Sequence, residues 1–302
     1  MHSKSRIVVG TLAALLAGCG GGDLQGASGP GPVALNSATD ALRELGNAAA
    51  AARLAQTPLP GACSSGTDAI VGPATKSRSF VYFTGFSGSV TYETHNYSAC
   101  VDNGLTYDGL LEAGATGDGA YTYAVRGSSS AVLLVRSTLS SGGTTLEMAQ
   151  SQLGTIEVHT TGAQTEVRSG LQSRVEQTPQ GASSPSYSGA MTIGVDGPTF
   201  DVLTDSAGNG GNGSQTLAGA YSYSSSRCSG GKAEVATPSA LLLQPAPDGS
   251  SPYPTGGTLT ISSGNSVVTY RFSEAGATLS DSVSGSLSSS QVQQAFSSGS
   301  GC

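Results

Sequence analysis

The sequence contains little charge and no tryptophan, and both features limit what the protein can do. Only 11% of its residues are charged, against roughly 25% in a typical soluble domain, and the net charge is −7. A nucleic-acid partner requires a basic patch, so the acidic balance argues against one. The absence of tryptophan removes the aromatic platform that sugar-binding sites usually provide.

Catalytic and metal-binding motifs are also missing. The chain has no G-x-S-x-G nucleophile elbow, no C-x-x-C pair and no P-loop lysine after its glycine-rich segments. His95 and His159 lie in alternating strand-like segments, where a solvent-facing position is the simplest interpretation. A Gly-rich loop offers calcium the oxygens of Asp205, Asn209 and Asn212, but it has one carboxylate and no EF-hand spacing. We therefore expect no metal, no cofactor and no enzymatic activity.

Two clusters of acidic residues supply the enzymatic alternative, because paired carboxylates are the machinery of glycoside hydrolases. Turns such as Asp102-Asn103-Gly104 and Asp108-Gly109 give these acids a sufficient local role, since Asp and Asn adopt the αL conformation and bind their own backbone. An enzyme acting on glycans predicts two acids facing each other in a cleft. The acids are Asp102, Asp108, Glu112 and Asp118 in one cluster and Asp196, Asp201 and Asp205 in the other.

The start of the chain has the composition of a targeting segment. Lys4 and Arg6 precede an apolar run, Ile7 to Gly18, which is shorter than the roughly 20 residues that a membrane span requires. We expect residues 1–18 to be a signal peptide that is removed. An ordinary secretory signal that happens to contain a cysteine is the alternative.

The end of this run, Leu16-Ala17-Gly18-Cys19, resembles the lipobox of bacterial lipoproteins. The resemblance implies cleavage before Cys19 and acylation of that cysteine and of the new N-terminus, with palmitate among the acyl chains. Two or more acyl chains anchor a protein stably to a membrane. Gly20 replaces the Asp that retains enterobacterial lipoproteins in the inner membrane, so we expect the outer membrane, on its periplasmic or surface face.

Residues 19–36 are rich in Gly and Pro and are interpreted as a flexible tether. The only long helical pattern follows within residues 37–57. Ser37 is positioned to cap it with Asp40 three residues later, and Leu42, Leu45 and alanines form a narrow apolar stripe. Prolines 58 and 60 end the pattern.

The body, residues 63–302, changes to period-two alternation separated by Gly, Ser, Asn and Asp clusters. This spacing predicts a mainly β fold with one N-terminal helix, as an antiparallel meander, a curved sheet or a sandwich. Two similar halves, 63–176 and 187–302, are possible, because Gly119–Tyr123 is echoed by Gly219–Tyr223. A short helix over 289–296 is expected to dock Val292 and Phe296. Strands are predicted at 79–83, 89–93, 120–125, 132–135, 155–158, 164–167, 190–193, 200–203, 220–223, 258–261 and 267–272.

Four cysteines remain after Cys19, and an even number in an exported chain favours disulfides. Three pairings are possible. We prefer Cys63–Cys100 and Cys228–Cys302, because each bridge then lies within one half of the chain. A bridge across a loop of this size contributes about 3–4 kcal/mol to stability.

The body also resembles β-rich exported proteins of proteobacteria. The likeness rests on Tyr97-Ser98-Ala99-Cys100, on Asp108-Gly109 and on the stretch Tyr253 to Ile261. It implies turns and strands, and it brings no known activity. The sequence thus favours a lipid-anchored envelope protein with a structural or interaction role, with the membrane and an envelope component as partners.

A binding module for a lipid or another apolar ligand in a curved sheet is the second hypothesis. It predicts an apolar cavity lined by Phe80, Tyr82, Tyr121 and Tyr123.

Overall fold

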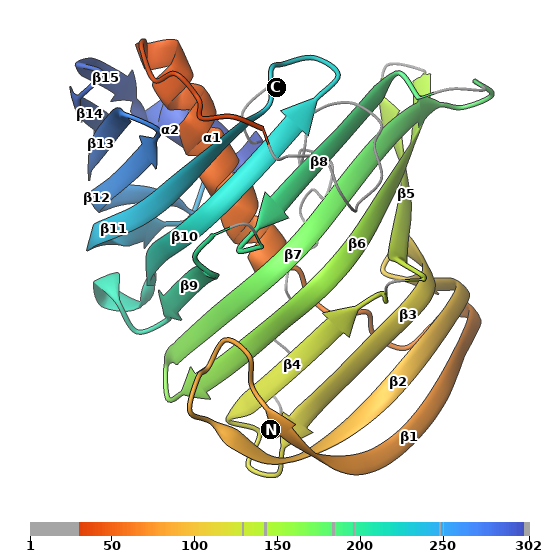
Figure 1. Ribbon diagram of the computed structural model, residues 1–302. Helices are drawn as coiled ribbons and strands as arrows, with labels where there is room; N and C mark the ends of the chain where they lie inside the picture. Colours follow the sequence, from red (N-terminus) through yellow and green to blue (C-terminus); the bar gives the residue numbers. More distant parts are fainter. Residues whose placement is uncertain are drawn as a thin grey trace.

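The computed structural model describes residues 30–298, apart from residues 129, 142–143, 183–184, 196, 248 and 250. These residues form one antiparallel sheet of 15 strands and two α-helices (Figure 1). The predicted mainly β fold with an N-terminal helix is confirmed. The strands are β1 Ser65–Ser79, β2 Ser87–Asp102, β3 Leu105–Thr116, β4 Tyr121–Arg126, β5 Leu133–Ser141, β6 Thr144–Thr161, β7 Gln164–Pro179, β8 Tyr187–Ile193, β9 Phe200–Asp205, β10 Ser214–Ser225, β11 Gly231–Gln244, β12 Tyr253–Ser263, β13 Ser266–Ser273, β14 Gly276–Asp281 and β15 Gly285–Ser288.

The sheet is open, with β1 and β15 at its two edges. Its strands run in the order β1-β2-β3-β4-β6-β7-β8-β10-β11-β12-β13-β14-β15, while β5 pairs with β3 and β6 and β9 pairs with β7 and β10. The β7–β8 ladder joins the strands before residue 176 to those after residue 187. Whether the two halves arose by duplication stays a prediction. No helix among the described residues is long and apolar enough to cross a membrane.

Helix α1 (Ala38–Ala55) begins where the sequence predicts. The Ser37 hydroxyl accepts a hydrogen bond from the Asp40 amide at 3.1 Å and donates one to the Asp40 carboxylate at 2.7 Å. This bond is the main reason that the pKa of Asp40 lies below its ordinary value. The alanine-rich stripe lies on one face of the sheet, where Ala48 and Ala51 are completely buried. Helix α2 (Ser289–Ser298) packs beside α1 and buries Val292 and Phe296, as predicted.

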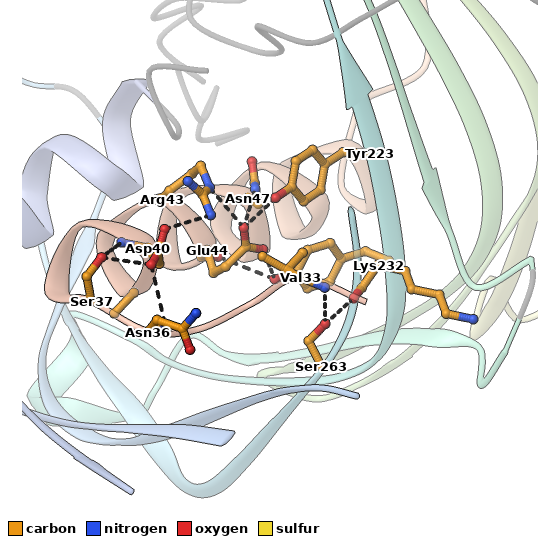
Figure 2. A network of polar contacts seen from close by, with 12 residues as sticks. Val33, Asn36, Ser37, Asp40, Arg43, Glu44, Asn47, Tyr223, Lys232 and Ser263 are labelled. Carbon is orange, nitrogen blue, oxygen red and sulfur yellow. Dashed lines mark hydrogen bonds and ion pairs between the residues drawn. The ribbon is translucent and has the colours of Figure 1, made fainter. Parts of the chain in front are cut away.

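Glu44 joins α1 to the sheet through a buried polar network (Figure 2). Its side chain is completely buried and accepts hydrogen bonds from the hydroxyls of Tyr223 and, at 3.2 Å, Tyr221. Arg43 and Asn47 also contact the carboxylate, each at 3.3 Å. Burial, with the nearby carboxylate adding to it, raises the pKa values of Tyr221 and Tyr223, so both phenols remain protonated donors.

The opposite face of the sheet is covered by a different element, the connection between β1 and β2. We call Phe80–Phe86 the hairpin tip. Glu157 on β6 is completely buried and accepts hydrogen bonds from the amides of Val81 and Tyr82, both at 2.8 Å, and of Phe83 at 3.3 Å. The strand predicted at 79–83 is therefore wrong: β1 ends at Ser79, because these amides bind a carboxylate instead of a neighbouring strand.

Cys63 and Cys100 form a disulfide that links the segment before β1 to β2. Cys19 and Cys302 lie outside the described residues, as do the predicted signal peptide and most of the predicted tether. The Cys228–Cys302 pairing and the lipidation of Cys19 stay predictions.

Candidate functional site

A groove of about 480 Å³ opens on the sheet face that points away from α1. The register defines this face. Ser222 pairs with Thr192 on one side and with Lys232 on the other, while its neighbours Tyr221 and Tyr223 point to Glu44 on the helix side. The volume falls within the range of small-molecule sites, about 300–1,000 Å³. The groove is lined by Thr192, Gly194, Val195, Ala220, Tyr221, Ser222, Lys232, Ala233, Glu234, Ser262, Ser263 and Gly264.

Small residues make the floor of the groove flat. Gly194, Ala220 and Ser222 lie side by side on β10 and at the end of β8, where larger side chains would fill the space. Gly194 is required by the backbone as well. Its φ is +62°, and a Cβ at this position would lie 2.1 Å from the Ser169 carbonyl oxygen. The turn after β8 can therefore fold closely over the sheet only with glycine here.

One side of the groove carries two opposite charges. Lys232 and Glu234 are both exposed and alternate with the buried Ala233 and Val235 along β11. Residues two apart on a strand project from the same face, about 6.5–7 Å from each other. Within the described part of the chain, neither side chain has an oppositely charged group within ion-pair distance. Both charges are therefore available to a ligand.

The first described residues of the chain border the same groove. The Lys232 amide donates to the Gly31 carbonyl at 3.1 Å, and Pro32 forms a parallel bridge with Lys232. The Ser263 hydroxyl accepts from the Val33 amide and donates to the Lys232 carbonyl, both at 2.6 Å. Figure 2 shows the two Ser263 contacts, with the Lys232 side chain extending away from the helix network. The segment that leads to α1 is thus attached at the groove rim.

The hairpin tip lies next to the opposite end of the groove. Tyr82 covers Gly170, where a Cβ would come within 2.3 Å of the tyrosine hydroxyl and 3.2 Å of the Gly194 carbonyl oxygen. Arg168 holds this part of the tip by donating to the Tyr82 carbonyl at 2.8 Å. The floor is therefore bounded by the hairpin tip at β7 and by the N-terminal segment at β11 and β12.

The described acids of the two clusters contact backbone amides, hydroxyls or basic side chains. Asp102 accepts from the Gly61 amide at 2.7 Å, and Asp118 binds Thr116 and the Ala120 amide. Asp108 accepts from the Ala99 amide at 2.8 Å and pairs with Arg136. Glu112 pairs with Lys76 at 2.7 Å and accepts from the Tyr123 hydroxyl. Asp196 lies outside the described residues.

Asp201 differs from the other acids because burial raises its pKa to about 6, with the nearby Arg168 opposing the shift. Its carboxylate lies 3.7 Å from the Arg168 guanidinium, on the flank of the hairpin tip. The Gly-rich loop considered for calcium makes internal contacts: Asn209 donates to the Leu243 carbonyl at 2.7 Å, and Asp205 accepts from the Ala207 amide at 2.9 Å. No cluster of three metal-binding side chains occurs in the described ranges.

The two histidines are more enclosed than a solvent-facing position implies. His95 Nδ1 lies 2.8 Å from an Asp68 carboxylate oxygen, and its ring stacks on Tyr97. His159 stacks on Tyr121 with ring centroids 4.2 Å apart. His159 Nε2 lies 3.0 Å from the Thr161 hydroxyl. Among the described residues, His95 has a carboxylate partner and His159 a hydroxyl partner, but neither has both, as a catalytic triad requires.

Three of the four aromatic residues expected around an apolar cavity, Phe80, Tyr121 and Tyr123, pack against one another instead, whereas Tyr82 lies over Gly170. Phe80 and Tyr123 are 3% and 2% exposed, and together with Phe83 and Val90 they form a closed cluster beneath the hairpin tip. Tyr121 fills the edge of this cluster, stacked on Phe86 at 3.8 Å. The groove lies elsewhere on this face, and polar side chains such as Ser222, Lys232 and Glu234 line it.

Comparisons with known proteins give no match: no family model, no curated protein and no solved structure is significantly similar to this chain.

Proposed function

We propose that the protein is a lipid-anchored, non-catalytic binding protein of the bacterial cell envelope. The observation that carries this proposal is the segment Leu16-Ala17-Gly18-Cys19 at the end of a short apolar run. It supplies the only motif in the chain whose chemistry can be named, the acylation of a cysteine thiol. Gly20 favours the outer membrane as the destination of the anchored protein.

An interaction role is favoured by what surrounds the open groove. Lys232 and Glu234 offer two unpaired charges to a ligand, while the acids and histidines considered for catalysis contact backbone amides, hydroxyls, charged side chains or aromatic rings. A site of small hydroxyls and separate charges can hold a polar ligand by hydrogen bonds. Its lining contains one carboxylate, Glu234, whereas glycoside hydrolysis uses a pair.

The anchor is tested by Cys19→Ala in the full-length protein expressed in a Gram-negative bacterium fed with labelled palmitate. The wild-type protein should sediment with membranes and carry label, whereas the variant should lose the label and remain unprocessed or soluble. Cys63→Ala/Cys100→Ala is the matched control, since these thiols bind each other and their loss should leave the label in place. A labelled Cys19→Ala protein would contradict the proposal.

A further inference from the structure

The positions of the polar groups in the groove favour a ligand that carries both a positive and a negative charge. Lys232 and Glu234 project from the same face of β11, and the hydroxyls of Thr192, Ser222 and Ser262 lie on the floor beside them. Within the described residues these three hydroxyls have no hydrogen-bond partner among side chains or backbone. A ligand that carries one anionic and one cationic group therefore finds a counter-charge for each, with donors and acceptors between them.

The same arrangement disfavours polyanions, polycations and purely apolar ligands. A polyanion would meet the Glu234 carboxylate, and a polycation would meet the Lys232 ammonium. An acyl chain would leave the floor hydroxyls without partners, which is costly in a desolvated site. The spacing of about 6.5–7 Å between the two charged positions suits groups joined by a short bridge, such as a phosphate and an ammonium on adjacent carbons.

The position of the groove favours a membrane as the source of this ligand, and this step rests on the proposed anchor. The segment Gly31–Val33 is hydrogen-bonded to the groove rim. Cys19 lies eleven residues before Pro30, and a fully extended chain of that length spans at most roughly 36–40 Å. An acylated Cys19 would keep the groove within that distance of the lipid headgroups and raise their effective concentration.

We propose that the groove binds the zwitterionic phosphoethanolamine headgroup of a membrane phospholipid. The Lys232 ammonium donates to the phosphate oxygens, and the Glu234 carboxylate accepts from the ligand ammonium. The hydroxyls of Ser222 and Ser262 donate to the remaining phosphate oxygens. The small floor residues Gly194 and Ala220 leave room for the headgroup to lie flat on the sheet.

The recognition is tested by calorimetric titration of the purified full-length protein in detergent with glycerophosphoethanolamine. We expect saturable binding, weakened about tenfold or more by Lys232→Gln and by Glu234→Gln. Arg271→Gln is the matched control, because Arg271 is an exposed cation on β13 of the same sheet, and it should leave binding unchanged. All three side chains are exposed, so circular dichroism should show that each variant is folded.

Two further titrations test which group of the ligand Lys232 binds and which group Glu234 binds. Glycerophosphate should bind more weakly than glycerophosphoethanolamine, and Glu234→Gln should leave its affinity unchanged or improve it. Lys232→Gln should abolish glycerophosphate binding. Equal affinity of the wild-type protein and both charge variants for glycerophosphoethanolamine, or no binding at millimolar concentrations, would overturn the proposal. Binding of a neutral disaccharide in place of glycerophosphoethanolamine would also overturn it and would indicate a glycan ligand.

The membrane source is tested with Cys19→Ala protein exported behind a conventional signal peptide. This protein should float with vesicles containing phosphatidylethanolamine and not with vesicles of phosphatidylglycerol alone, and Lys232→Gln should abolish flotation. Binding of the soluble probe without flotation would contradict a membrane source. Because this protein lacks the anchor, a failure to float with vesicles does not bear on the acylation of Cys19 in the wild-type protein. Conversely, a finding that Cys19 is not acylated would not change the result of the headgroup titrations.

Discussion

One completely buried carboxylate connects the sheet to the element that covers each of its faces, α1 on one side and the hairpin tip on the other. The donors and acceptors are reversed between the two sides. On the helix side, Glu44 belongs to the cover, and the donors are the tyrosine hydroxyls of the sheet. On the hairpin-tip side, Glu157 belongs to the sheet, and the donors are consecutive backbone amides of the cover. The two sites therefore respond differently to mutation. The tyrosine hydroxyls on the helix side can be removed by substitution, whereas the backbone amides on the hairpin-tip side remain when Glu157 is replaced.

The echo between Gly119–Tyr123 and Gly219–Tyr223 illustrates the same contrast. Tyr121 and Tyr123 lie on the hairpin-tip face, against Phe80 and Phe86. Tyr221 and Tyr223 lie on the helix face, against Glu44. Similar alternating sequences therefore point their aromatic rings to opposite sides of one sheet, because strand register and not local sequence decides which face is covered.

The largest effect is expected from Glu157→Ala. It leaves three amides of the hairpin tip without an acceptor and removes the ion pair with Arg78, which is 3.5 Å long. Breaking a buried charged network of this kind costs roughly 3–5 kcal/mol. Denaturant unfolding should show this loss, and hydrogen exchange should accelerate at the amides of residues 81–83.

Glu147→Ala on the same strand is the control for this experiment. Glu147 is exposed, so its substitution should change stability by less than about 0.5 kcal/mol. A Glu157→Ala protein as stable as the Glu147→Ala protein would show that the hairpin tip does not depend on the carboxylate.

A smaller and reversible effect is expected from Glu44→Leu. It removes the carboxylate that accepts from the hydroxyls of Tyr221 and Tyr223 and leaves Tyr221 only the backbone carbonyl of residue 44, at 3.4 Å. We expect a cost of about 2–3 kcal/mol. Adding Tyr221→Phe and Tyr223→Phe removes the hydroxyls that lost their carboxylate acceptor. It should restore roughly half of the lost free energy of unfolding. A triple variant no more stable than Glu44→Leu alone would contradict the proposed difference between side-chain and backbone donors.

The smallest effect is expected from Asp201→Asn, beside the hairpin tip. The pKa of Asp201 is raised from 3.8 to about 6 by burial, so the folded protein holds this proton more tightly than the unfolded chain. The stabilising contribution of the protonated form is therefore complete below pH 3.8 and is lost as the pH rises towards 6.

At pH 7 the Asn variant should be more stable than the wild type by on the order of 1 kcal/mol, a value reduced for solvent screening. The difference should vanish below about pH 4. Unfolding measured across this pH range checks the sign, and a difference that is independent of pH would contradict the assignment.

The sequence predicts the helices and many strands of this fold, because their signals are local. Ser37 with Asp40 marks the start of α1, and Val292 with Phe296 marks the buried side of α2. The strand predicted at 79–83 fails because its alternating aromatic residues are also what a covered hairpin tip requires. Its amides bind Glu157, a residue more than seventy positions later, and no local pattern contains that contact.

The groove could not be predicted from local sequence either. Strand β11 alternates small and polar residues rather than large apolar ones, so Lys232 and Glu234 did not stand out as neighbours on one face. Their alternation with Ala233 and Val235 is the signal that would have placed them there. The meeting of this strand with Gly194 and with the Gly31–Val33 segment depends on long-range register and is visible only in the folded chain.

The most direct test of a membrane-tethered binding protein is the mass of the N-terminal peptide of the protein extracted from bacterial membranes. We expect a peptide that begins at Cys19 and carries a diacylglycerol and an amide-linked acyl chain. A peptide that begins at another residue, or a Cys19 without lipid, would contradict it.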